Sequence, residues 1–314
     1  MTFRVLTSFH YFRDRDMAEL VDTLRQDYGG AVEMFADSGA FSAATLGVTI
    51  SLADYRAWLT DWSGLITTAA TLDVIGDPVA TARNTEALEA AGLTVLPTFH
   101  VGTPWPVLEA LCARHRYIAL GGMVPHTKEP TAVLRWLIRC FRVAAETGTV
   151  FHGFGQTRLD TLAALPFYSV DSSTWASGAR YGALTLWDET RARLVPVQAG
   201  NPQAAQRHAD LLRSHGADPA AVGRPGFASL KHRSREQFEA ELLMMRGVPA
   251  VAFTRLGQWL ARRHRVPAPP GWHGAGTSLF LAETRRRHLR RGALGLAVSN
   301  GRPARLLDVE EAAR

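Results

Sequence analysis

Two aspartates of the sequence lie where an apolar segment ends and a turn begins. Asp37 opens the segment 37–42, which reads DSGAFS, and Asp171 lies in the segment 169–175, which reads SVDSSTW. Two carboxylates at strand ends, far apart in the sequence, suit glycosidic-bond chemistry, because one attacks the anomeric carbon while the other transfers protons. An isolated Asp after a strand is usually a turn or capping residue. The interpretation therefore depends on what accompanies these two.

Other apolar segments end in polar or glycine residues in the same way. Read in chain order, the strand ends carry His10, Asp37 with Ser38, Asp73, His100, Gly121 with Gly122, His152 and Asp171. In a barrel of parallel strands the carboxyl ends of all strands share one mouth, so residues that are distant in the sequence converge there. We therefore expect one site that combines carboxylates, imidazoles and a Gly-Gly step.

Alternating strand-like and helix-like segments would position these residues. Strands are predicted at 3–9, 32–37, 67–73, 94–99, 117–121, 149–154 and 167–171. Helices are predicted between them at 16–27, 51–62, 78–91, 104–115, 130–146 and 157–165. Such β-α repeats with short connections predict an α/β protein with a parallel sheet and, at this count, a TIM-type (β/α)8 barrel. No GxGxxG sequence follows the first strand, which disfavours a dinucleotide-binding fold.

The alternation stops after Gly182. The next predicted elements are a hairpin at 184–197, helices at 202–215 and 234–246, and an eighth strand at 248–253. We predict a barrel domain over residues 1–265 with an insertion near 183–247, followed by a basic helical C-terminal extension over 266–314.

Composition limits the class of protein. The chain has 314 residues, 46% of them hydrophobic, and no apolar run near the ~20 residues that a membrane span requires. Its start reads directly into a strand without the apolar region of a signal peptide, which predicts a cytoplasmic protein. Cys112 and Cys140, the two cysteines, are expected to be buried free thiols, and two cysteines cannot form a Cys-rich zinc site.

Positive charge is concentrated toward the end of the chain. The net charge is +6, the pI is near 9.8, and Arg-rich runs occupy 262–265 and 285–291. Such runs can follow a phosphate backbone, with each contact adding salt-sensitive affinity. The alternative is a solvated Arg-rich helix face.

Several short motifs follow one another between residues 30 and 182. They read DSGAFS at 37–42, LDV at 72–74, GGM at 121–123, GFG at 153–155, SVD at 169–171 and RYG at 180–182. In order and spacing they resemble the tRNA-guanine transglycosylases, and among these the shorter 7-deazaguanine DNA-insertion (DpdA-like) proteins of phages and bacteria. The similarity covers somewhat under half of the chain. Ala40 and Ser42 depart from the family pattern Asp-Ser-Gly-Gly-aromatic-Gln.

The resemblance implies a base exchange through a covalent intermediate. Asp171 would attack C1′ of a guanosine nucleotide, Asp37 would act as general acid and base, and Asp73 would accept hydrogen bonds from the guanine edge. Further substrate contacts are implied for Ser38, Phe41 (stacking on the base), His100, Gly121, Gly122 and His152. The two histidines stand where the tRNA enzymes carry a Gln and a Met.

The implied partners are DNA and a free 7-deazaguanine base of the preQ0 type. The tRNA enzymes have a Cys-rich zinc site that this chain cannot build, which favours DNA over tRNA and predicts neither a metal nor a cofactor. Phosphate contacts are expected from Arg180, Arg285, Arg286, Arg287, Arg290 and Arg291. A helicase or ATPase partner that opens the duplex stays an open question, and a phage-encoded protein would work in the host cytoplasm.

Other interpretations remain. One is a tRNA-guanine transglycosylase without zinc. A second is a metal-dependent barrel hydrolase with His10, His100, His152 and an Asp as ligands, although no His-x-His follows the first strand. A retaining glycoside hydrolase and a DNA-binding scaffold with a degenerate site complete the alternatives. Trp175 could stack on a nucleobase, but we expect it to be a core residue.

Overall fold

One curled sheet of eight parallel strands forms the centre of the computed structural model, which describes residues 2–28, 30–126, 128–229, 234–272 and 277–283. The strands are β1 (Phe3–Ser8), β2 (Val32–Asp37), β3 (Ile66–Ala69), β4 (Thr98–His100), β5 (Tyr117–Gly121), β6 (Val150–Gly153), β7 (Ser169–Ser172) and β10 (Ser278–Glu283). Their order in the sheet is β3-β2-β1-β10-β7-β6-β5-β4. Apart from β10, sheet neighbours are neighbours along the chain, as the β-α alternation predicts.

The two edge strands of this sheet are connected by a short contact. An isolated parallel bridge pairs Ala70, directly after β3, with Leu96, just before β4. The Thr71 N–H donates to the Leu96 carbonyl at 2.9 Å, and the Leu96 N–H donates to the Ala69 carbonyl at 2.8 Å. The predicted α/β fold with a parallel sheet is confirmed, and the sheet is curled in a TIM-like arrangement.

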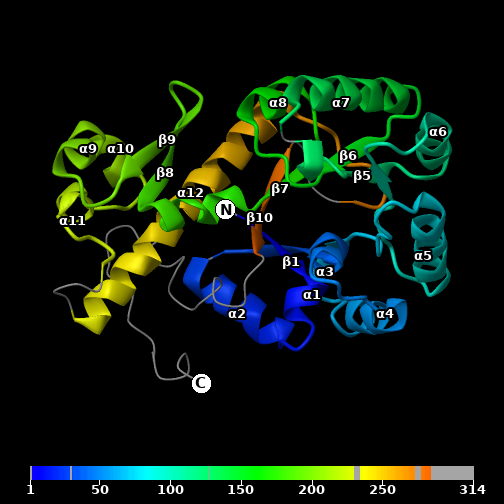
Figure 1. Ribbon diagram of the computed structural model, residues 1–314, viewed down its shortest axis with the longest axis horizontal. Helices are drawn as coiled ribbons and strands as arrows, with labels where there is room; N and C mark the ends of the chain where they lie inside the picture. The colour runs from blue at the N-terminus through cyan, green and yellow to red at the C-terminus, as the bar shows by residue number, and fades with distance from the viewer. Residues whose placement is uncertain (1, 29, 127, 230–233, 273–276, 284–314) are drawn as a thin grey trace.

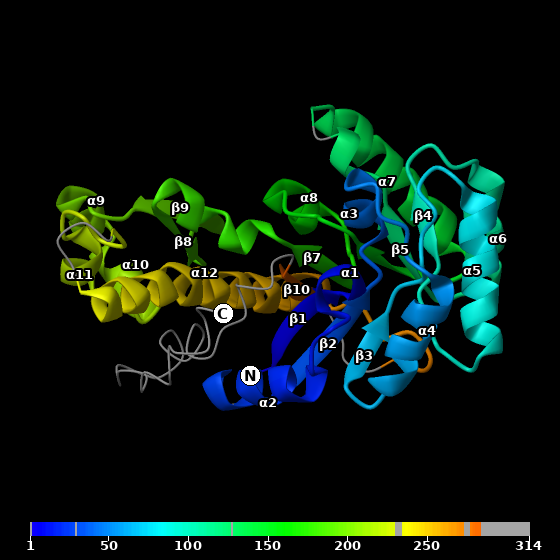
Figure 2. The ribbon, with the colours of Figure 1, turned by 60° about the horizontal axis from the view of Figure 1, so that its bottom comes forward.

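Helices connect successive strands and lie outside the sheet (Figures 1 and 2). They are α2 (Met17–Tyr28), α4 (Leu52–Asp61), α5 (Pro78–Ala90), α6 (Trp105–Arg114), α7 (Pro130–Ala145), α8 (Leu159–Ala164) and α12 (Arg235–His264). Side-chain caps fix several starts: Ser51 accepts from the Asp54 N–H, and Asp77 accepts from the Val79 and Ala80 N–H groups. These caps satisfy amide groups that a first helical turn leaves without partners.

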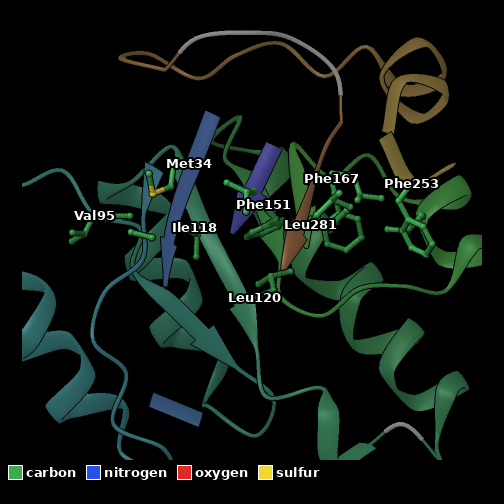
Figure 3. Close-up of a cluster of buried hydrophobic side chains, with 14 of the residues drawn as sticks. Met34, Val95, Ile118, Leu120, Phe151, Phe167, Phe253 and Leu281 are labelled. Atoms are coloured by element: carbon green, nitrogen blue, oxygen red, sulfur yellow. The ribbon is translucent and has the colours of Figure 1, made fainter. Parts of the chain in front are cut away.

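Two apolar layers lie on the two faces of the sheet, because successive strand residues point to opposite sides. The outer layer packs strand residues such as Ile118, Phe151 and Leu281 against helix residues such as Phe253 (Figure 3). The inner layer is a separate cluster of Leu6, Phe35, Ala70, Leu96, Tyr117, Ala119, Tyr168, Val266, Phe280 and Ala282. Trp272 packs edge-on against Tyr117 in this layer, with ring centroids 4.9 Å apart. The curl thus encloses a packed interior of its own.

A second lobe interrupts the alternation between β7 and α12. It contains the hairpin β8 (Ala183–Asp188) and β9 (Arg193–Gln198), then α9 (Pro202–Arg207), α10 (Ala209–Ser214) and α11 (Pro219–Gly223). The predicted hairpin is therefore confirmed. The lobe has its own core, to which the first half of α12 contributes Met245 and Val248. The second half of α12 packs in the outer layer of the sheet through Phe253, Leu256 and Leu260, so one helix serves both cores (Figure 1).

The eighth strand is not where the sequence predicted it. Residues 248–253 are helical and lie within α12, whereas β10 occupies the eighth position, between β1 and β7. A short continuous apolar run does not distinguish a buried helix from a strand, which is why the prediction was wrong. The sheet consequently extends to residue 283, beyond the boundary predicted at 265. In the extension predicted as helical over 266–314, the described residues 266–272 and 277–283 contain no helix, and the basic run at 285–291 lies outside the described residues.

Two expectations from composition concern membranes and thiols. Among the described residues, no helix is long and apolar enough to cross a membrane. Cys112 and Cys140 are both buried and free, as predicted.

Candidate active site

The side chains of the polar residues predicted at the strand ends point to the inner face of the curled sheet. Ala36, Phe99 and Phe151 belong to the outer layer. Their next neighbours, Asp37, His100 and His152, therefore point to the enclosed side. The same alternation puts Asp171 inward, since Val170 is an outer residue. All strands are parallel, so these side chains gather at the carboxyl edge of the sheet.

Asp37 is the carboxyl group whose proton affinity the site changes most clearly. It ends β2, and its Oδ2 accepts the Gly39 N–H at 3.1 Å. Desolvation, together with the negative charges of Asp73 and Asp171, raises the pKa of Asp37 to about 7. The electrostatic influence of both other aspartates shows that the structure brings the three predicted carboxylates together.

The turn after Asp37 requires glycine at position 39. Gly39 has φ of 76°, and a Cβ there would lie 2.1 Å from Ser8 Oγ and 2.7 Å from the Cβ of His10. The His10 N–H also donates to the Ser38 carbonyl at 3.3 Å. Close backbone packing between the ends of β1 and β2 therefore sets the position of Asp37. Ser38 is buried, and its Oγ accepts the Ala40 N–H at 3.4 Å.

Asp171 differs from Asp37 in having a histidine beside its carboxylate. Its Oδ1 accepts the Gly155 N–H at 2.8 Å, from the turn after β6. The Nε2 of His152 lies 3.3 Å from the same oxygen, at ion-pair distance without the alignment of a full hydrogen bond. The Asp171 side chain is 10% exposed and His152 is fully buried. Burial lowers the pKa of His152, against the raising effect of Asp171, so the imidazole is neutral.

Asp73 follows β3 and pairs with a second histidine. The His100 Nε2 lies 3.2 Å from Asp73 Oδ2, and the two side chains are 18% and 13% exposed. Among the described residues nothing hydrogen-bonds to the buried Oδ1 of Asp73. The loop around it is fastened to α5, where Thr81 Oγ1 accepts the Val74 N–H and Asn84 donates to the Leu72 carbonyl. A fixed carboxylate oxygen with no protein donor suits a ligand N–H.

The Gly-Gly step makes room for His100. A Cβ on Gly121 would lie 2.9 Å from the His100 Cδ2, and one on Gly122 would lie 3.3 Å from its Cβ. Gly122 also has φ of 75°. The imidazole therefore fills the space beside these glycines that the resemblance assigns to the substrate base.

Apolar side chains surround the mouth. Phe41, on α3 (Ala40–Thr45), is 49% exposed, and Leu46 and Val48 after it are exposed as well. Val74 and Ile75, in the loop that follows Asp73, are also exposed. Exposed apolar residues next to partly buried carboxylates give a surface on which a flat aromatic group can lie.

Several basic or aromatic candidates have structural roles or lie outside the described residues. Trp175 is buried and donates from Nε1 to the Ala282 carbonyl at 3.0 Å, so it is a core residue as expected. In the run 262–265, Arg263 and His264 donate to the Ala163 and Leu162 carbonyls at the end of α8. The side chain of Arg180, and Arg285, Arg286, Arg287, Arg290 and Arg291 entirely, lie outside the described part of the chain.

Two residues of the site were missed by the sequence argument. The hydroxyl of Ser169 hydrogen-bonds to the His152 Nδ1 at 2.5 Å and to the hydroxyl of Tyr117. Ser169 lies two residues before Asp171 on β7, and Tyr117 lies four before Gly121 on β5, so both share the inward phase. Strand alternation was the signal that could have identified them.

The described residues contain no group of three or more His, Cys, Asp or Glu side chains arranged to hold a metal ion. Comparison with family models, curated proteins and solved structures finds no match to this chain. An assignment of function therefore depends on the geometry of the three carboxylates and on the motifs that carry them.

Proposed function

We propose that this chain is a base-exchange transglycosylase that replaces guanine in DNA with a 7-deazaguanine derivative. The observation that supports it best is the contrast between two carboxyl groups at one mouth. Asp37 has its pKa raised to about 7, whereas Asp171 is held by the Gly155 N–H and stands beside His152. Carboxyl groups with opposed surroundings are how one site provides both a proton carrier and a nucleophile.

The chemistry divides into two balanced displacements. A carboxylate oxygen of Asp171 bonds to C1′ while the bond from C1′ to the base nitrogen breaks, and the electron pair leaves with the base. The proton of Asp37 neutralises the departing guanine. The resulting carboxylate then removes a proton from the incoming base, whose nitrogen attacks C1′ and releases Asp171. A group with a pKa of about 7 can give and take this proton near neutral pH.

Recognition of the base is assigned to Asp73. Its Oδ1, buried and without a donor among the described residues, would accept from the guanine N1–H or the exocyclic amine. His100 holds Oδ2 and thereby fixes the plane of the carboxylate. Phe41 would stack on the base that enters the mouth. The same edge is present in 7-deazaguanines, so the site would accept both the leaving and the entering base.

DNA is the proposed polymer. The net charge is +6, and the Arg-rich run at 285–291 provides phosphate contacts in our proposal. A base reaches the mouth only after leaving its stack, which costs a few kcal/mol and requires a firm hold on the backbone. We also propose that the Ala70–Leu96 bridge marks a barrel that closes between β3 and β4.

The test is incorporation of radiolabelled guanine or preQ0 into guanine-containing DNA and, separately, into tRNA. We expect label in DNA, and a protein–DNA adduct after denaturation, from the wild type but not from Asp171→Asn. Asp188→Asn is the matched control, because Asp188 is a buried aspartate of the second lobe. Label in tRNA alone would assign the substrate to tRNA. No label in either would contradict base exchange.

A further inference from the structure

A chain of buried hydroxyl and imidazole groups crosses three neighbouring strands behind Asp171. It begins at the Tyr117 hydroxyl on β5, which hydrogen-bonds to Ser169 Oγ on β7. Ser169 Oγ continues to His152 Nδ1 on β6 at 2.5 Å, and His152 Nε2 faces Asp171 Oδ1 at 3.3 Å. All four residues are buried. The mechanism proposed above makes no use of Ser169 or Tyr117.

The donor and acceptor of each hydrogen bond in this series follow from the groups at its two ends, the Asp171 carboxylate and the Tyr117 hydroxyl. As the proposed nucleophile, Asp171 acts as a carboxylate, which only accepts, so we expect the neutral His152 that faces it to carry its proton on Nε2. Its Nδ1 then has only a lone pair, and the Ser169 hydroxyl must donate to it. Ser169 Oγ is left to accept from Tyr117, whose pKa is raised by burial, so that the phenol keeps its proton.

We propose that Ser169 and Tyr117 are positioning residues for Asp171: they fix the Nε2–H tautomer of His152 and thereby hold Oδ1 of the carboxylate, so that Oδ2 is the attacking atom. The proposal rests on the proposed function in taking Asp171 as the nucleophile. The Gly155 N–H donates to the same Oδ1 at 2.8 Å. Within the described residues, the Gly155 N–H and the His152 Nε2 thus both contact Oδ1 of Asp171.

The apolar surroundings of His152 make this tautomer depend on Ser169. The ring centroid of Phe35 lies 4.4 Å from that of His152, and the ring of Phe154 lies at 4.7 Å. Neither ring offers a hydrogen-bond acceptor in the plane of the imidazole. Without the Ser169 hydroxyl, Nδ1 would have no polar partner among the described residues, and only the 3.3 Å contact of Nε2 with Asp171 would still favour the proton on Nε2.

The first measurement is the tautomer of His152, by ¹⁵N NMR of protein labelled at histidine, with His152→Gln to assign its signals. We expect a proton on Nε2 and a bare Nδ1 in the wild type, and mixed tautomers in Ser169→Ala. A wild-type proton on Nδ1 would overturn the proposal, whether or not the protein exchanges bases. Thr7→Val is the control, because Thr7 Oγ1 is buried without a hydrogen-bond partner among the described residues.

The second measurement is the rate of adduct formation with DNA. Because it loosens the His152 imidazole that lies 3.3 Å from the Asp171 carboxylate, Ser169→Ala should slow this step about 10- to 100-fold with an unchanged KM for DNA. Tyr117→Phe, one bond further away, should slow it about 2- to 10-fold. Ser169→Thr should restore most of the rate, since it keeps the hydroxyl. Equal rates in Ser169→Ala and the wild type would refute the positioning role.

A failure of the proposed function would look different. A wild-type protein that forms no adduct contradicts base exchange. The tautomer measurement still decides whether Ser169 donates to His152 Nδ1 and leaves the proton on Nε2.

Discussion

Three aspartates of the site have the same side chain and three different surroundings. Asp37 is desolvated and feels two negative charges, Asp171 receives the Gly155 N–H, and Asp73 pairs with His100. Proton affinity depends on burial, nearby charge and hydrogen bonding. At the scale of single residues, the role proposed for each aspartate therefore depends on the groups around it and not on its residue type alone.

The raised pKa of Asp37 predicts a stability cost above neutral pH. Because the folded pKa is about 7 against an ordinary value of 3.8, the folded state retains a proton that the unfolded chain loses in this window. Stability therefore falls as pH rises through the window and stays lower above it. Asp37→Asn should remove this loss, so that at pH 8 the variant is more stable than the wild type by roughly 2–4 kcal/mol.

Urea unfolding of both proteins from about pH 3 to pH 8 checks this prediction. The difference should disappear at the acid end, where both states of the wild type are protonated. A difference that stays constant across the range would contradict the raised pKa. Base exchange should be lost in the variant at every pH, because an amide cannot carry the proton.

Asp73→Asn tests the recognition of the base. An amide replaces one acceptor by a donor, which would face the N–H groups of guanine. We expect kcat/KM for guanine exchange to fall about 10- to 1000-fold, with the thermal midpoint little changed. Competition between labelled guanine and adenine measures the selectivity. Unchanged discrimination would show that another residue reads the base.

At the scale of elements, the site depends on close contact between neighbouring strands. Gly121 ends β5 against the imidazole of His100, which ends β4. The run at the end of α12 shows the same principle, because Arg263 and His264 donate to carbonyl groups at the end of α8. Cations at a helix C-terminus satisfy its free carbonyls. Part of the basic run at 262–265 therefore connects α12 to α8 through hydrogen bonds.

Gly121→Ala should displace His100 from Asp73. The new Cβ would lie 2.9 Å from the His100 ring. We expect a loss of about 1–3 kcal/mol in the free energy of unfolding and weaker base exchange. The double variant Gly121→Ala/His100→Ala should lose less stability than the sum of the two single variants, by about 0.5–3 kcal/mol. Additive losses would mean that the glycine does not serve to place this imidazole.

At the scale of the whole molecule, α12 links two cores. Met245 and Val248 belong to the core of the second lobe, and Leu256 and Leu260 belong to the outer layer of the sheet. Figure 2 shows this helix running from the lobe to the sheet. A perturbation confined to one core can therefore open one part of the protein while the other part stays folded.

Leu212→Ala tests this separation. Leu212 is fully buried in the lobe core, and its truncation should cost about 2–5 kcal/mol. Hydrogen exchange should accelerate in β8, β9 and α10, with the amides of β1 and β5 still protected. Leu137→Ala is the matched control, because Leu137 is fully buried on α7 in the outer layer of the sheet, and it should affect β5 and β6 instead. Equal acceleration everywhere would indicate a single cooperative unit.

The sequence by itself determined the alternating elements, the hairpin and the polar residues at the strand ends. These features follow from local rules: strand periodicity, helix caps and short connections. It also favoured a core position for Trp175. It could not locate the eighth strand, because residues 248–253 and 278–283 are both short apolar runs and only packing chooses between helix and strand for such a run.

The tertiary structure alone decided how the site residues act on one another. The raised pKa of Asp37, the pairing of His100 with Asp73 and the chain from Tyr117 to Asp171 all join residues from different strands. Desolvation, charge and hydrogen bonding act over a few ångströms of space and not along the sequence. That is why the sequence predicted which residues share the mouth, and only the fold assigned their partners.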